Sequence, residues 1–115
     1  MKNIFAAAAA SLIALSASAA GLDGKTLYQQ NCASCHGDNA KGGTSEVKGP
    51  KLAGDASKWS LKLFSRAVLS GIDDKGKKLE LAMPHWKDAS FKSDQGKAPT
   101  KQEIAAIHRY LRKLK

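Results

Sequence analysis

The sequence has few cysteines and few aromatic residues, and each shortage excludes a class of protein. Its 115 residues contain only two cysteines, too few for the several disulfides that stabilise small secreted domains. These two, Cys32 and Cys35, stand so close that a bridge between them would constrain the unfolded chain little. Aromatic residues make up only 6% of the chain, so its own side chains can form only a thin core. We therefore expect a chemical role for the cysteine pair and a bound group within the core.

The sequence also lacks an apolar run long enough to cross a membrane. The apolar stretch within residues 1–20 extends over about 12 positions, whereas a spanning helix needs roughly 20. A charged start precedes it and small residues follow it, which is the pattern of a secretory signal peptide. We expect export, cleavage near Ala19 or Ala20, no integral membrane segment afterwards, and one domain over residues 21–115.

Acidic residues are scarce as well. The chain has 10 of them against 19 Lys and Arg, a formal net charge of +9. Lys2 leaves with the signal peptide, so the mature chain has a net charge of +8. Export argues against nucleic-acid binding, and the lysine-rich stretch 75–78 lacks the interleaved aromatic residues that stack on bases. We interpret the basic charge as a solvated face that attracts an acidic partner.

No stretch alternates apolar and polar residues as a half-buried strand does, so the pattern predicts an all-α chain. Three helices are expected: one capped by Asp23 over 24–36, one over 57–70 ended by Gly71, and one that follows the capping box Thr100–Glu103, with Ile104, Ile107 and Leu111 on its apolar face. Irregular stretches lie between them at 38–54 and 87–99. Loops of this length usually carry a function or surround a cofactor.

The two cysteines belong to the motif Cys32-Ala33-Ser34-Cys35-His36, inside the first predicted helix. Helical positions i, i+3 and i+4 share a face, so both sulfurs and the imidazole point the same way. Covalent haem attachment needs this arrangement, with two thiols to add across the two vinyl groups and an imidazole to meet the iron. Cys-x-x-Cys-His is the attachment signature of c-type haem. The motif predicts one haem c bound through Cys32 and Cys35, with His36 as an axial iron ligand.

Three other interpretations of the cysteine pair are weaker. A redox dithiol of the thioredoxin kind is expected beside a strand-helix-strand pattern, which the sequence lacks. A zinc site needs four ligands and, without further cysteines, would have to recruit His85 or His108 across long loops. A structural disulfide is disfavoured by the short spacing.

The chain resembles the class I c-type cytochromes, the small monohaem carriers of bacteria and mitochondria. Four pieces stand in that family's order: the Cys-x-x-Cys-His motif, Gly49-Pro50-x-Leu52, Met83-Pro84, and an amphipathic last helix that bears Tyr110. The resemblance covers essentially all of residues 21–115. It implies the cytochrome c fold, with three to five short helices and long loops wrapped around one covalently bound haem.

The second axial ligand is a methionine in that family, on a loop that closes over the other face of the haem, which implies Met83. The residues point the same way, since Met1 leaves with the signal peptide and Met83 is the only other methionine. A methionine that only fills a core is seldom placed before a proline in a loop rich in Gly and Lys. The main alternative ligand is His85, and His108 is weaker because it lies on the edge of the last helix's apolar stripe. A thioether raises the reduction potential relative to a second imidazole.

The resemblance also implies contacts around the haem. The imidazole of His36 is expected to donate its second N–H to the backbone carbonyl of Pro50. Trp59 and Arg66 are weaker candidates for hydrogen bonds to a haem propionate, because packing or a solvated helix face explains each of them.

Two further residues are expected to hold the edge of the haem by packing. The family's first and last helices cross where Gly24 and Tyr28 fall, which implies close approach at Gly24 and packing of Tyr28 near Ile107 and Tyr110. The stretch 86–99 is longer than expected between the methionine and the last helix, which indicates a loop specific to a partner.

The resemblance implies a monomeric periplasmic electron carrier that is not an enzyme, since two axial ligands leave no open position on the iron. The alternative is a haem c subunit of a larger dehydrogenase or oxidase complex. The polar mature chain favours the carrier, because it has no sustained apolar patch such as an obligate interface buries. Its redox partners should present acidic docking surfaces to the lysines of the loops expected around the haem edge: Lys41, Lys48, Lys51, Lys75, Lys77, Lys78 and Lys87.

Overall fold

Helices and connecting loops make up the described part of the chain, which is residues 22–80 and 82–114 of a computed structural model. The helices are α2 (Gly24–Asn31), α3 (Ala33–His36), η1 (Ala56–Lys58), α4 (Leu61–Ser70), η2 (Trp86–Asp88) and α5 (Lys101–Lys113). Within those residues the β-type pairing is limited to one isolated bridge, between Ile72 and Lys78. The prediction of an all-α chain is confirmed. The predicted signal peptide lies outside the described residues.

The first predicted helix is two helices, α2 and α3, which meet at Cys32. Asp23 caps α2 as expected, because its carboxylate accepts the Lys25 N–H and the Thr26 hydroxyl. The side-chain amide of Asn31 donates to the Leu27 carbonyl at 2.9 Å, and the Cys32 N–H still donates to the Tyr28 carbonyl at 2.8 Å, so the hydrogen bonds of α2 extend to Cys32. The chain turns at Cys32 and continues into α3, which ends at Gly37.

The second predicted helix begins later than the pattern indicated. Ser57 lies in η1, and α4 begins only after Ser60, whose hydroxyl accepts the Leu63 N–H at 3.2 Å. The predicted end is confirmed, since Gly71 closes α4 in the left-handed conformation, with φ of 69°. Phe64 of α4 is buried, whereas Leu61 is 42% exposed.

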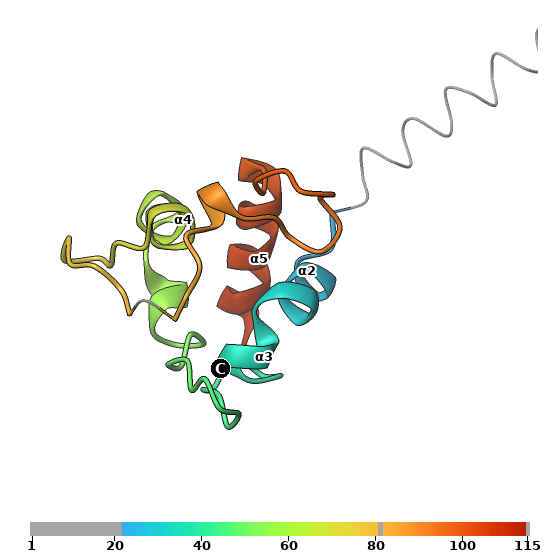
Figure 1. The fold of residues 1–115 in the computed structure, drawn as a ribbon. Coiled ribbons are helices and arrows are strands. Elements are labelled where there is room, and N and C mark those ends of the chain that lie inside the picture. The colour runs from blue at the N-terminus through green and yellow to red at the C-terminus, as the bar shows by residue number, and fades with distance from the viewer. Residues whose placement is uncertain (1–21, 81, 115) are drawn as a thin grey trace, which may run out of the picture.

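The third helix, α5, begins at the predicted capping box. Thr100 Oγ1 accepts the Glu103 N–H at 3.1 Å, and Glu103 Oε1 accepts the Thr100 N–H at 2.9 Å. The predicted apolar face is buried, at Ile104, Ile107 and Leu111. Figure 1 shows α5 in the middle of the molecule, with α4 on one side and α2 on the other.

Helices α2 and α5 cross where Gly24 lets the two backbones touch. A Cβ atom at Gly24 would overlap the carbonyl oxygen of Ala106 and lie 2.6 Å from its carbonyl carbon. One turn further along α2, the ring of Tyr28 is fully buried, 5.8 Å from the ring of Tyr110 between centroids. The Tyr28 hydroxyl donates to the Gly37 carbonyl at 2.6 Å, and burial raises the pKa of Tyr28, which keeps that donor protonated. This crossing fixes α3, which follows directly from α2.

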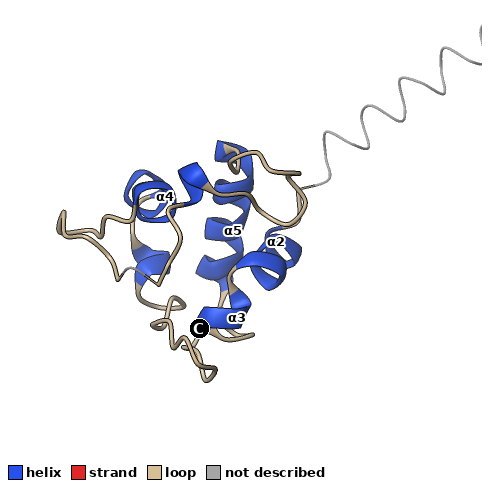
Figure 2. Ribbon diagram, viewed as in Figure 1, coloured by secondary structure: helices blue, strands red, loops and turns tan. Residues whose placement is uncertain are grey.

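The loops between the helices are long, as expected (Figure 2). The segment after η2 was predicted to be polar and irregular, yet Phe91 is buried and meets Trp86 edge-on at 4.9 Å between ring centroids. Its backbone is tied to α2, because the Lys92 N–H donates to the Asn31 side chain at 2.8 Å. None of the helices in the described residues is long and apolar enough to cross a membrane.

Gly24→Ala tests the helix crossing, and the sign of its effect is informative. In an ordinary helix the change would stabilise the protein by about 1 kcal/mol. Here the new methyl meets the Ala106 backbone, so we expect the free energy of unfolding of the haem-bound protein to fall by about 1–3 kcal/mol. Denaturant titration measures it. Lys25→Ala, at an exposed position of the same helix, is the control. A more stable Gly24→Ala protein would contradict the crossing.

Candidate functional site

A large cavity opens between α3, α4, α5 and three loops, at residues 38–54, 72–85 and 87–99. Its volume is about 610 Å³, within the range of about 300–1,000 Å³ that is typical of ligand sites. Most of its wall is apolar and comes from all of these elements, with Leu52, Phe64, Val68, Leu79, Ile104, Ile107 and Leu111 among its lining residues. The residues expected to form a thin core therefore surround a space that suits a large, mostly apolar group.

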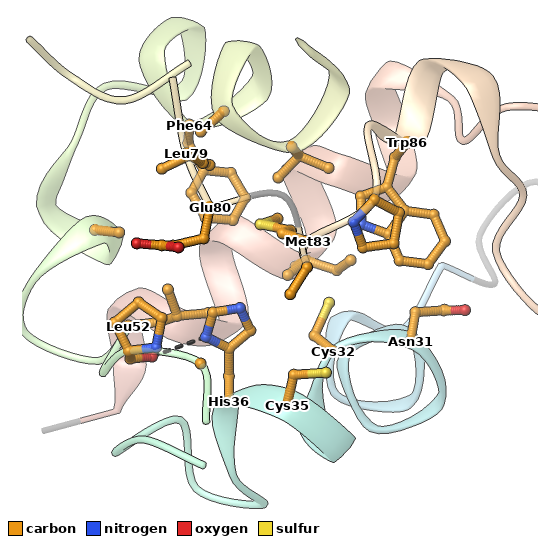
Figure 3. Close-up of a pocket in the computed structure, with 18 of the residues that line it drawn as sticks. Asn31, Cys32, Cys35, His36, Leu52, Phe64, Leu79, Glu80, Met83 and Trp86 are labelled. Atoms are coloured by element: carbon orange, nitrogen blue, oxygen red, sulfur yellow. Dashed lines mark hydrogen bonds between the residues drawn. The ribbon is translucent and has the colours of Figure 1, made fainter. Parts of the chain in front are cut away.

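Both cysteines and His36 lie on one wall of this cavity, at α3 (Figure 3). The two thiols are free and form no bond with each other. Burial, and to a smaller extent the neighbouring Cys35, raises the pKa of Cys32 to about 12, so its thiol is neutral at physiological pH. The turn at Cys32 starts α3, so the helical spacing from Cys32 to His36 is kept and the three side chains share one face.

The ring of His36 is held by the glycine-rich loop that follows α3. Its Nδ1 lies 2.8 Å from the carbonyl oxygen of Pro50. A carbonyl can only accept, so Nδ1 carries the proton and Nε2 keeps a free lone pair for a metal. The loop sits directly on α3 because Gly49 has no side chain: a Cβ there would lie 2.9 Å from His36 Nδ1 and 2.7 Å from the Cys35 carbonyl. The loop is also bonded to α3, since the Gly49 N–H donates to that carbonyl at 2.7 Å.

Met83 lies in the opposite part of the cavity wall, across from His36 (Figure 3). The two alternative ligands are placed elsewhere. The ring of His85 is in contact with Gly71, and His85 is not among the residues that line the cavity. His108 is buried on α5, where its Nε2 donates to the Trp59 carbonyl at 2.8 Å and its ring packs 5.0 Å from that of Phe64. The described residues therefore place one of the three, Met83, beside the cavity.

The two candidates for a propionate contact are also separated. Trp59 lines the cavity. Arg66 does not, because its guanidinium turns to the loop after α4 and donates to the Asp73 carbonyl at 2.6 Å. The role that the structure supports for Arg66 is therefore to hold the loop after α4 in place.

Some residues of the cavity wall were not expected from the sequence. Trp86 and Phe91 form an aromatic pair that closes the cavity on the side of the 86–99 loop. The sequence does contain a hint of this pair, since two aromatic residues stand in a polar stretch. Their spacing, however, fits neither a helix nor a strand. Glu80 also lines the cavity, and nothing in the sequence separates it from the other acidic residues.

An all-α chain that packs around an apolar cavity, with a Cys-x-x-Cys-His turn in its wall, defines a c-type cytochrome. The comparisons with known proteins agree: the family described as Cytochrome c matches residues 22–115, and the chain belongs to that family. Comparison with the curated proteins and with the solved structures gives no match.

Membership of this family establishes the cytochrome c fold and the cofactor. The family binds haem c covalently through the cysteine pair, here Cys32 and Cys35, and its members are generally electron-transfer proteins. The cavity suits this group, because its wall is apolar and both free thiols lie on it. When bound, the haem supplies an iron that accepts and gives up one electron. Cys32 and Cys35 would hold the haem, each by addition of its S–H across one vinyl C=C bond to give one thioether.

The haem should stay with the polypeptide when the protein is denatured. We expect acid-acetone extraction to leave all colour in the protein pellet, and intact mass to show one haem per chain, since two thioethers form. In Cys35→Ser at most one thioether, at Cys32, can form, whereas the Cys32→Ser/Cys35→Ser double variant should lose its haem to the solvent. Ser34→Ala, at an exposed position between the cysteines, is the control. A colourless pellet from the unaltered protein would contradict covalent attachment.

Proposed function

We propose that this chain is a single-electron carrier whose haem iron is held between His36 and Met83 and which exchanges electrons with periplasmic or membrane redox proteins. The observation that carries the proposal is the placement of these two side chains on opposite parts of the wall of one cavity. Export to the periplasm belongs to the proposal and rests on the sequence of residues 1–20.

The two proposed ligands differ in the kind of donor atom that they offer the iron. His36, with its N–H engaged by the Pro50 carbonyl, offers a basic imidazole in a fixed orientation. The thioether of Met83 is a softer donor, which favours ferrous iron and raises the reduction potential. With both positions taken, no site is left for oxygen or peroxide. This favours a carrier over an enzyme.

Met83→Ala tests the distal ligand. We expect loss of the weak long-wavelength iron–sulfur charge-transfer band and new binding of external ligands such as imidazole. Axial ligands set haem potentials over about 0.8 V, so the potential should fall by at least about 0.1 V. Optical spectroscopy and redox titration measure these changes.

Met83→His is the matched control, because it restores a second ligand of a different kind. It should lower the potential and still exclude external ligands. A band that is absent from the unaltered protein, or that survives Met83→Ala, would refute ligation by Met83. Its absence from the unaltered protein would leave His85 as the candidate.

The surface supports a carrier that meets its partners briefly. The large hydrophobic residues exposed in the described part of the chain are Leu22, Val47 and Leu61, which lie in three separate segments. Scattered apolar residues of this kind do not form the contiguous patch that a permanent interface buries. The alternative, a haem c subunit of a dehydrogenase or oxidase complex, predicts elution at high mass when native extracts are chromatographed. A carrier elutes as a monomer.

The charge of the surface indicates what kind of partner it meets. The loop lysines singled out in the sequence are all exposed: Lys41, Lys48, Lys51, Lys75, Lys77, Lys78 and Lys87. Lys48 and Lys51 also lie among the residues that line the cavity. An acidic docking surface would be drawn to this side, and such steering raises encounter rates by about 10 to 1,000-fold at low salt.

The second-order rate of electron transfer to the native partner should fall steeply with ionic strength. The screening length shortens from about 30 Å at 0.01 M to about 8 Å at 0.15 M. Lys48→Gln/Lys51→Gln should lower the low-salt rate and flatten its salt dependence. Lys101→Gln/Lys113→Gln, which makes the same charge change at exposed positions of α5, should do so much less. Stopped-flow kinetics measure both. A rate indifferent to salt would mean that the basic surface does not steer.

A further inference from the structure

His85 has a contact that ligation does not explain. Its imidazole lies directly against Gly71, the residue that ends α4. A Cβ atom at Gly71 would overlap His85 Nε2 and lie 2.6 Å from Cδ2, so no residue with a side chain fits there unless the ring moves. An exposed histidine, fourteen positions further along the chain, thus packs on the backbone of a helix end.

This contact closes the loop that carries Met83. At Gly71 the chain leaves α4 and turns back on itself, since the Leu79 N–H donates to the Gly71 carbonyl and the Asp73 N–H donates to the Lys77 carbonyl, both at 2.8 Å. It then passes Met83 and comes back to Gly71 at His85. A loop whose two ends touch and which packs on itself is an Ω-loop.

His85 is also held from its other side. Its carbonyl accepts the Asp88 N–H at 2.9 Å, which joins it to η2. Pro84 stands between Met83 and His85, and its ring fixes one backbone dihedral of the short connection. His85, with its ring against Gly71 and its backbone bonded to η2, therefore restricts where the neighbouring thioether can lie.

We propose that His85 and Gly71 form a latch that positions the Met83 sulfur over the haem iron, so that His85 is a positioning residue and not a ligand. The inference rests on the proposed ligation by Met83. A sulfur on an open loop loses conformational entropy each time it binds the iron, whereas a latched loop has already lost most of it. Opening the latch should make Met83 easier to displace.

The same loop contains a matched control for Gly71. Gly76 also has a positive φ, 82° against 69° at Gly71, so alanine at either position meets a similar backbone strain. A Cβ at Gly76 meets no atom within 4 Å. The difference between Gly71→Ala and Gly76→Ala therefore isolates the contact with His85.

The test uses the haem-bound protein and measures the affinity of the ferric iron for imidazole, which replaces the distal ligand. Loss of the iron–sulfur band reports this replacement. Since contacting residues couple by about 0.5–3 kcal/mol, imidazole should bind at least about twofold, and up to about a hundredfold, more tightly to Gly71→Ala than to Gly76→Ala. His85→Ala should have a similar effect. In the double variant, His85→Ala should change the imidazole affinity of Gly71→Ala little, because the contact between the two residues is already lost. His85→Phe keeps a flat ring and should stay close to the unaltered protein.

The outcomes separate the latch from the proposed function. Absence of the iron–sulfur band from the unaltered protein, with a ligand change in His85→Phe, would overturn ligation by Met83 and the latch with it. A normal band with equal imidazole affinity in Gly71→Ala and Gly76→Ala would overturn the latch alone. If Gly71→Ala does not fold, the comparison of His85→Ala with His85→Phe is the test. Tighter imidazole binding in His85→Ala than in His85→Phe supports the latch, and equal binding in the two variants refutes it.

Discussion

The structure depends on one constraint: the chain's own side chains do not fill the centre of the molecule. Helices α4 and α5 and three loops contribute apolar residues to a cavity of about 610 Å³. Residues of α5, such as Ile104 and Leu111, belong both to the helix packing and to the cavity wall. A chain with so few large side chains gains much of its apolar burial only when a haem is enclosed. The cofactor is therefore part of the core as well as the site of chemistry.

The two sides of the cavity are built by different means. On the His36 side, a glycine-rich loop lies against α3 through backbone hydrogen bonds and the contact between Pro50 and the imidazole. Rigid backbone fixes this side chain. On the Met83 side the wall is a loop held at its ends, by backbone pairing near Gly71 and by the ring of His85. In the proposed carrier the iron changes charge in each cycle, and both sets of contacts would limit the movement of the two proposed ligands.

Much of the fold was predicted from local patterns. The capping box at Thr100, the left-handed end of α4 at Gly71 and the all-α class are confirmed, since each depends on residues that are close in the chain. The break at Cys32 and the late start of α4 were missed, because helical periodicity does not register the change of backbone conformation at Cys32 or the extra turn η1 before the Ser60 cap. The aromatic pair of the 86–99 loop was missed because its partners are distant in sequence.

The sequence by itself determined the attachment of the cofactor. Two cysteines and a histidine at positions i, i+3 and i+4 reach one face through local helical geometry alone, and the matching family binds haem c through that pair. The far side of the cavity was decided by the tertiary structure. Met83, His85 and His108 were all possible ligands from residue type, and only the packing of the folded chain put Met83 at the cavity, His85 on Gly71 and His108 against the Trp59 carbonyl. The physical reason is that a loop has no internal periodicity, so its side chains point where contacts with remote parts of the chain direct them.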